Sequence, residues 1–308
     1  MTLCAQKNNM VKSGKNILEG AITAIVTPFT KKGDVDFTAL KKLLQYQIDN
    51  GINGIIVCGS TGEAVTLTDE EYAQVVKFAV DEVGGKVPVW AGAGSNSTAR
   101  AVALSKIAKS CGVGGLLHVT PFYNKPTPNG LVAHYKAIAD AVNLPIILYN
   151  VPGRTGSNVL PPTIVRIARE VPQVVGVKEA SGNINQIEEM IKSAPEGFVV
   201  LSGDDALTLP AIIMGARGCI SVVANEAPKE FTALCQAGLR SDWVLANELH
   251  AKLLDLMNVN FIETNPIPVK TALAMMGIIE ESFRLPMVAL EEKNRPAIRA
   301  CLEKLKLI

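Results

Sequence analysis

The sequence of 308 residues predicts an α/β protein, a (β/α)8 or TIM barrel followed by a C-terminal helical extension. Three observations lead to this prediction. Eight short apolar runs recur along the chain, amphipathic segments separate them, and the strand signal stops near residue 225. Near-continuous apolar runs are typical of parallel strands buried on both faces. Eight such strands alternating with helices are the pattern of a closed barrel.

The apolar runs give the eight predicted strands. In chain order they are "GAITAIVTPF" from residue 20, "GINGIIVCGS" from 51, "VPVWAGAG" from 87, "GGLLHVTPF" from 114, "LPIILYNVP" from 144, "VVGVKEASG" from 174, "GFVVLSGDD" from 197 and "GCISVVAN" from 218. The main rival is an open doubly wound sheet. The count of eight and the lack of a glycine-rich dinucleotide fingerprint after the first strand favour the barrel.

Helical periodicity fills the gaps between the strands. Residues 36–50 carry apolar side chains at helical spacing, and the segment from Thr68 opens with an N-cap residue and the acids of a helix start. After Asn225 four segments are helical by pattern. We therefore predict a flexible N-terminal arm over residues 1–16, a catalytic barrel over residues 17–225 and a helical extension over residues 226–308.

Composition narrows the class of protein. A net charge of +1 gives no basic or acidic surface suited to nucleic acid or to a membrane. The three histidines are scattered, so no metal site is expected, and the six cysteines form no C-x-x-C pair. No apolar run reaches the roughly 18–20 residues that span a bilayer, and the first 16 residues lack the apolar core of a signal peptide. We expect a cytoplasmic protein with reduced thiols.

Polar and glycine-rich residues gather where the predicted strands end. In chain order these ends read "VTPF", "CGSTGE", "GAGSN", "TPFYNKP", "YNVPGRTG", "KEASG", "SGDD" and "VVAN", while the strand bodies stay apolar. The carboxyl ends of barrel strands meet on one face, which is where TIM barrels carry their active sites. The sequence therefore predicts an active site built from several strand ends.

Lys178 ends an otherwise apolar run. Burial disfavours a charged ammonium, and a neutral amine can attack a ketone to form a Schiff base. Strand alternation predicts that Val175 and Val177 share one face and that Gly176 leaves room inside the barrel for the lysine stem. The alternative is a structural lysine paired with Glu179 or another acid.

Five further residues could serve such chemistry. In "GSTGE", Ser60 and Thr61 offer hydroxyls and backbone N–H groups at an expected anion site. A phenol such as Tyr149 can relay protons near an imine, and Arg154 can hold a carboxylate in a bidentate grip. Tyr123 adds a second phenol, for which packing at a subunit contact is an equal alternative. Taken singly, each of these residues also fits an ordinary loop, core or surface position.

The motifs together resemble a known family. "GSTGEAVTL", "VTPFYNKPTPNGL", "YNVPGRTG", "GVKEASG" and "SGDDA" occur in this order at predicted strand ends. They resemble the pyruvate-dependent, Schiff-base-forming lyases of the dihydrodipicolinate synthase and N-acetylneuraminate lyase superfamily, along the whole barrel and into the helical tail. With its arginine, the motif "YNVPGRTG" resembles the synthase branch of this superfamily. The resemblance implies condensation of pyruvate with L-aspartate-4-semialdehyde, which opens lysine and diaminopimelate biosynthesis, with no metal or organic cofactor.

The resemblance also implies catalytic roles for four residues. Lys178 would form the imine with pyruvate, and Tyr149 would donate and accept protons beside it. Ser60 and Tyr123 would complete a hydroxyl relay. Tyr123 would reach in from the neighbouring subunit of a tight dimer, and two dimers would form a homotetramer.

Four more residues would bind the substrates. Thr61 would hold the pyruvate carboxylate, Arg154 would engage the carboxylate of the semialdehyde, and Gly203 and Ile220 would line the pocket.

Two positions depart from the family pattern. Ser60 stands where threonine is usual, and it lacks the methyl group that restricts rotamers. In members of the family that lysine inhibits, histidines and a glutamate help to form the effector site. The matching positions here carry Asp69, Tyr72 and Arg100, whereas the asparagine of that site is kept as Asn96. Arg100 thus replaces an acid that would hold the ammonium group of lysine. Because like charges repel, we expect weak or absent inhibition by lysine.

Two other functions stay open on the sequence. An aldolase of the same superfamily would act on N-acetylneuraminate or a 2-keto-3-deoxy sugar acid, and the loss of Arg154 should impair it less than a synthase. A catalytically silent barrel would bind a keto acid as a sensor or scaffold, which fits poorly with an intact Lys178, Tyr149 and Tyr123.

Overall fold

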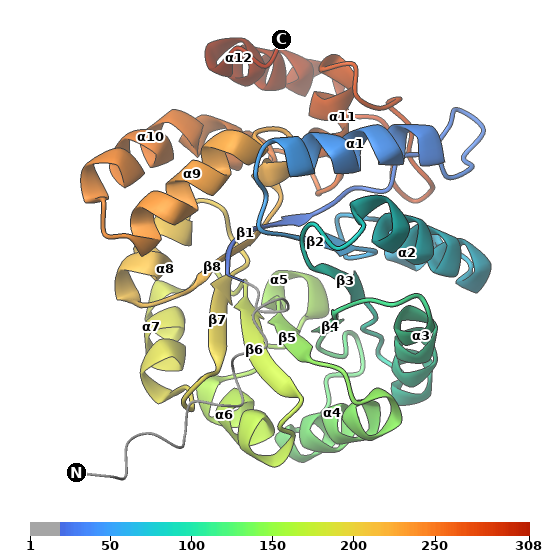
Figure 1. The fold of residues 1–308 in the computed structure, drawn as a ribbon, viewed down its shortest axis with the longest axis vertical. Coiled ribbons are helices and arrows are strands. Elements are labelled where there is room, and N and C mark those ends of the chain that lie inside the picture. The colour runs from blue at the N-terminus through green and yellow to red at the C-terminus, as the bar shows by residue number, and fades with distance from the viewer. Residues whose placement is uncertain (1–18) are drawn as a thin grey trace.

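The computed structural model describes residues 19–308, and the predicted arm over residues 1–16 lies outside them. Eight parallel strands close into a barrel in chain order, with β8 paired to β1 (Figure 1). The predicted closed barrel is confirmed, and the alternative of an open doubly wound sheet is wrong. The strands are β1 (Gly20–Ala24), β2 (Gly54–Val57), β3 (Val89–Gly92), β4 (Gly115–Val119), β5 (Ile146–Asn150), β6 (Val174–Glu179), β7 (Val199–Ser202) and β8 (Gly218–Ser221).

Helices form a ring around the barrel (Figure 1). The ring consists of α1 (Phe37–Asp49), α2 (Asp69–Val83), α3 (Thr98–Ser110), α4 (Pro128–Val142), α6 (Pro161–Glu170), α7 (Ile184–Ser193), α8 (Thr208–Met214) and α9 (Pro228–Leu239). Shorter turns are α5 (Pro152–Thr155) and the 3-10 helices η1 (Ala64–Thr66), η2 (Val223–Asn225) and η3 (Glu292–Asn294). Since α9 packs against α8 and β1, it completes the ring. The proposed division at residue 225 therefore falls between the last strand and the last helix of the ring.

Beyond α9, the predicted extension contains three more helices, which lie outside the ring. They are α10 (Trp243–Val259), α11 (Ile267–Met275) and α12 (Arg295–Leu305). α10 packs on α9 and α12, and α11 contacts η2 just after the last strand. The extension thus reaches the carboxyl ends of the strands. Within residues 19–308, no helix combines the length and the apolar character that crossing a membrane requires.

Local sequence explains where the helices begin. Thr68 caps α2 by accepting a hydrogen bond from the Glu71 backbone, and the Glu71 side chain accepts one from the backbone of Thr68. Asp36 caps α1 through the backbone N–H of Ala39. Each such cap contributes about 1 kcal/mol to helix stability. Both predicted helix starts are confirmed.

Two apolar layers bury the strands on both faces. One layer fills the barrel interior and includes Ile22, Ile56, Trp90, Leu117 and Leu201. The other lies between the strands and the ring of helices. This double burial is the reason that the strands read as continuous apolar runs rather than as alternating ones.

A β-bulge interrupts β6. Ile146 pairs with Val174 but Ile147 pairs with Gly176, so Val175 is an extra residue on this strand. Val175 packs with the interior layer, whereas Val177 packs with the outer layer. The prediction that these two valines share a face is wrong, because a bulged residue breaks the alternation of the strand.

The bulge determines which side chain enters the barrel. Without it, strict alternation from Val174 would point Val177 inward and Lys178 outward. With it, Lys178 pairs with Tyr149 on the inner face.

Candidate active site

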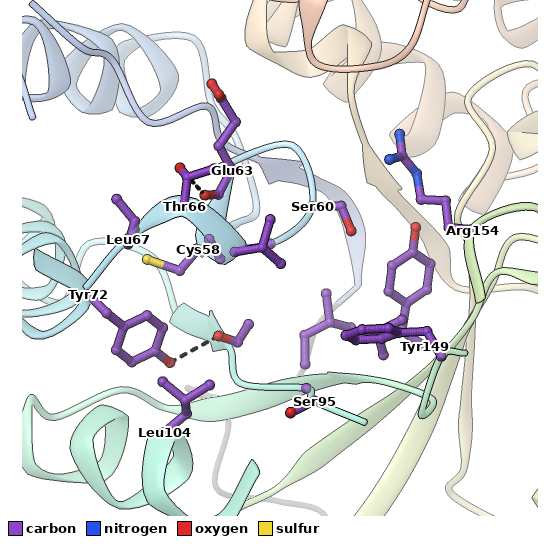
Figure 2. Close-up of a pocket in the computed structure, with 18 of the residues that line it drawn as sticks. Cys58, Ser60, Glu63, Thr66, Leu67, Tyr72, Ser95, Leu104, Tyr149 and Arg154 are labelled. Atoms are coloured by element: carbon purple, nitrogen blue, oxygen red, sulfur yellow. Dashed lines mark hydrogen bonds between the residues drawn. The ribbon is translucent and has the colours of Figure 1, made fainter. Parts of the chain in front are cut away.

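Two adjoining cavities open at the carboxyl ends of the strands, with volumes of about 150 and 430 Å³. The larger cavity continues from the barrel mouth toward α2 and α3 (Figure 2). Six of the eight predicted site residues line the smaller cavity. They are Ser60, Thr61, Tyr149, Arg154, Lys178 and Gly203.

Lys178 lies on the floor of the smaller cavity and is only 5% exposed. Its Nζ atom stands 4.4 Å from the centroid of the Tyr149 ring. The glycine that admits the lysine stem is Gly203, because a Cβ atom there would lie 2.9 Å from Lys178 Cε. A Cβ at Gly176 would instead meet Val199 and Ile147. The prediction that Gly176 makes this room is therefore wrong.

Glu179 does not pair with Lys178. Adjacent strand residues point to opposite faces, and the buried Glu179 carboxylate accepts hydrogen bonds outside the barrel. Asn150 Nδ2 donates to its two oxygens at 3.0 and 3.2 Å, Gln186 Nε2 donates at 3.2 Å and the Ser181 backbone at 2.8 Å. The alternative of a Lys178–Glu179 ion pair is thus excluded. The Asn150–Glu179 contact joins β5 to β6 at the residues that directly follow Tyr149 and Lys178.

The turn after β2 presents donors to the cavity. Gly62 N–H donates to Gly59 O at 3.1 Å and Glu63 N–H donates to Ser60 O at 3.2 Å, which closes the turn. Among the described residues, neither the Ser60 nor the Thr61 N–H has a hydrogen-bond partner. Successive backbone N–H groups of this kind can bind an anion such as a carboxylate.

Asn265 connects this turn to Arg154, and the sequence reasoning missed it. Its Nδ2 atom donates to Thr61 Oγ1 at 3.0 Å, and its backbone oxygen accepts a bond from Arg154 Nη2 at 3.0 Å. Asn265 belongs to the helical extension and lies 204 residues from Thr61 and 111 residues from Arg154 along the chain. No local pattern signals contacts over such separations.

Two predicted site residues lie elsewhere. Ile220 is fully buried in the interior layer below the cavity, whose wall is formed instead by Val222, two residues further along. Tyr123 lines neither cavity. It is 89% exposed and has a backbone φ of 71°, a left-handed conformation that is uncommon for a residue with a side chain.

Tyr72 and Arg100, two of the positions that the family resemblance relates to lysine inhibition, line the larger cavity. Arg100 binds Asp69 through both terminal nitrogens, one of them at 2.7 Å. The hydrogen bond with Arg100 lowers the pKa of Asp69, while burial raises the pKa of Tyr72 well above its usual value. Tyr72 donates its hydroxyl to Gly92 O at 3.0 Å (Figure 2).

The chemistry available at the site comes from an amine, a phenol, hydroxyls and a guanidinium group. Ser60, Tyr149 and Arg154 lie together at the junction of the two cavities (Figure 2). Within the part of the chain that the structure describes, no group of three or more His, Cys, Asp or Glu side chains is arranged to hold a metal ion. A nearly dry amine beside proton donors suits covalent catalysis on a carbonyl compound.

Known proteins share this sequence and fold. A family model described as the Dihydrodipicolinate synthetase family matches residues 17–305. The chain is 52% identical to the 4-hydroxy-tetrahydrodipicolinate synthase of Maridesulfovibrio salexigens over 290 residues, which cover 94% of this chain and 99% of that protein. The solved dihydrodipicolinate synthase from Aquifex aeolicus has a TM-score of 0.92 at 46% identity, covering 94% of this chain and 99% of its own.

A further solved structure bears on the ligand. The chloride-inhibited dihydrodipicolinate synthase from Acinetobacter baumannii, in complex with pyruvate, matches with a TM-score of 0.93 at 45% identity and covers 95% of this chain and 100% of its own. The resemblance drawn from the strand-end motifs is confirmed, and the chain belongs to the dihydrodipicolinate synthetase family.

Proposed function

We propose that this protein condenses pyruvate with L-aspartate-4-semialdehyde to 4-hydroxy-tetrahydrodipicolinate, the first committed step of lysine and diaminopimelate biosynthesis. The observation that carries the proposal is Lys178, nearly excluded from water, with its Nζ atom 4.4 Å from the Tyr149 ring. The relative from M. salexigens is named for this activity, and the A. baumannii enzyme binds pyruvate. The protein would then be a lyase that works through a lysine Schiff base.

The covalent steps follow from the amine. Lys178 Nζ attacks C2 of pyruvate, and loss of water from the carbinolamine replaces the C=O bond by a C=N bond. The protonated imine withdraws electrons, so C3 loses a proton and becomes nucleophilic. Attack of C3 on the semialdehyde carbonyl forms the new C–C bond, and ring closure by the semialdehyde amine displaces Lys178. Tyr149 and Ser60 would pass the protons between these steps.

The two carboxylates would bind on opposite sides of the imine. The Ser60 and Thr61 N–H groups, without partners among the described residues, would hold the carboxylate of pyruvate. Arg154 would hold the carboxylate of the semialdehyde, and its bond to Asn265 O keeps the guanidinium at the cavity wall. Gly203 contributes space rather than contacts. These roles favour a synthase over an aldolase acting on sugar acids, which needs no such arginine.

The working unit would be a homotetramer, a dimer of dimers, in the cytoplasm. An aromatic side chain that is 89% exposed and held at a left-handed φ, as Tyr123 is, needs a reason to be kept there. Insertion into the site of a neighbouring subunit would supply that reason. The described cysteines are all free thiols, which suits a reducing compartment, and the partners would be small-molecule substrates.

Borohydride reduction in the presence of pyruvate should attach a reduced pyruvate group to Lys178. Peptide mapping by mass spectrometry locates the adduct, and protein without pyruvate is the control. Lys178→Ala should form no adduct and lose about 10³-fold or more in rate, because the nucleophile is gone. Folded, active wild-type protein that forms no adduct would exclude both the synthase and the sugar-acid aldolase.

Arg154→Met should raise the KM for the semialdehyde about 10–100-fold, the effect of losing a hydrogen-bonded charge. The rate at which borohydride traps the pyruvate imine should stay close to that of the wild type. Arg169→Met, the same change in α6 away from both cavities, is the matched control. Equal losses in imine formation and in the use of the semialdehyde would contradict this role for Arg154.

Co-assembly of two impaired variants tests the shared site. Tyr123→Phe should lower kcat about tenfold or more by removing the relay hydroxyl, while sedimentation still shows a tetramer. In tetramers that combine Tyr123→Phe with Lys178→Ala subunits, some sites receive an intact Lys178 from one chain and an intact Tyr123 from the other. Activity should therefore rise above that of either variant alone. No recovery in tetramers purified through two different tags would mean that Tyr123 does not serve the neighbouring site.

Lysine should inhibit weakly or not at all. The guanidinium of Arg100, paired with Asp69, lines the larger cavity where an acid would be needed to hold the ammonium of lysine. Initial rates measured against lysine at saturating and limiting pyruvate check this expectation. Half-inhibition at sub-millimolar lysine would refute it.

A further inference from the structure

A second buried lysine, Lys270, is bonded to the turn that lines both cavities. Lys270 of α11 and Glu63 of the turn after β2 form an ion pair with 2.6 Å between Nζ and Oε1, and their side chains are 0% and 2% exposed. The ammonium also faces the rings of Phe29 and Phe283, at 4.3 and 5.1 Å from their centroids. Burial lowers the pKa of Lys270, and the charge of Glu63 opposes that shift.

Stability alone is a weak explanation for this pair. The desolvation of two charges offsets most of their attraction, and buried ion pairs replaced by apolar residues often leave a protein equally stable. The pair also joins parts of the chain 207 residues apart, the barrel and its helical extension. The pair is therefore better explained by the segments of the chain that it holds in place.

Glu63 belongs to the turn that carries Ser60 and Thr61. Its backbone is left-handed, with φ of 50°, and its N–H group donates to Ser60 O at 3.2 Å. On the other side of the turn, Thr27 Oγ1 donates to Gly62 O at 2.7 Å. A residue with a side chain keeps such a conformation only where its surroundings fix it, and the bond to Lys270 is the strongest of these contacts by charge and distance.

We propose that Lys270 and Glu63 are a positioning pair for the pyruvate subsite. By fixing the carboxylate of Glu63, Lys270 holds the turn so that the Ser60 and Thr61 N–H groups point into the cavity beside Lys178. Neither residue of the pair touches the reacting atoms. This inference rests on the proposed function, because it assigns the turn to the carboxylate of pyruvate.

The two substrates should respond differently to loss of the pair. Arg154 is held by the backbone oxygen of Asn265, whereas only the side-chain amide of Asn265 contacts the turn, at Thr61, and neither bond involves Glu63. Disturbing the turn should therefore weaken pyruvate binding and leave the semialdehyde subsite intact. A general loss of structure would affect both substrates alike.

The test is the KM for each substrate in Lys270→Met, which keeps the length of the side chain but removes its charge. We expect the pyruvate KM to rise about tenfold, equivalent to about 1.4 kcal/mol, and borohydride trapping of the imine to slow correspondingly. The semialdehyde KM should change less than about twofold. Should Lys270→Met fail to fold, the double variant Glu63→Gln/Lys270→Met carries the test, since it leaves no unpaired charge in the core.

Two controls separate positioning from stability. Lys252→Met makes the same change at an ion-paired lysine of α10 that is remote from the turn, and it should leave both KM values unchanged. Leu302→Ala removes a fully buried side chain from α12 and lowers the melting temperature without touching the turn. It should not alter the ratio of the two KM values.

The outcomes distinguish the two hypotheses. A pyruvate KM at the wild-type value in both pair variants would overturn the positioning role, as would an equal rise in Leu302→Ala. If the wild type itself forms no imine with pyruvate, the proposed function fails and the positioning role fails with it.

Discussion

The site depends on one irregularity in the backbone, the extra residue Val175 in β6. A regular strand would pair Val177 with Tyr149 and would turn Lys178 toward the helices. The bulge shifts the register by one residue, so Lys178 enters the barrel and its neighbour Glu179 faces outward. There Glu179 accepts bonds from Asn150 and Gln186, which fixes β6 against β5. One extra residue thus places an amine next to a phenol and ties down the backbone behind them.

The helical extension completes the site rather than merely covering the barrel. Asn265 binds both the hydroxyl of Thr61 and the guanidinium of Arg154, and five residues later Lys270 binds Glu63. All these contacts come from the short segment that begins α11. The groups proposed to react all come from the barrel, whereas Thr61, Glu63 and Arg154 beside them are bonded to a part of the chain outside it.

Features that arise from repetition and topology could be predicted from the sequence. Eight apolar runs were enough to predict the barrel. Since the carboxyl ends of barrel strands share one face, the motifs at those ends were expected to lie close together. Contacts that depend on side-chain packing could not be predicted. The bulge leaves no mark in "VVGVKEASG", the room beside Lys178 comes from Gly203 on the next strand rather than from Gly176, and the role of Asn265 exists only through partners far away in the chain.

Lys178 and Lys270 show why residue type alone does not reveal function. Both side chains are almost completely withdrawn from water. Lys270 meets a carboxylate at 2.6 Å, so its amine is engaged as a charged donor and cannot act as a nucleophile. Lys178 meets an aromatic ring and an open cavity, and no ion pair within residues 19–308 involves it. An amine that no acid engages is the arrangement that the proposed Schiff-base chemistry requires. The two buried lysines therefore differ in whether the fold places an acid beside the amine: Glu63 pairs with Lys270, whereas Glu179 faces outward and does not pair with Lys178.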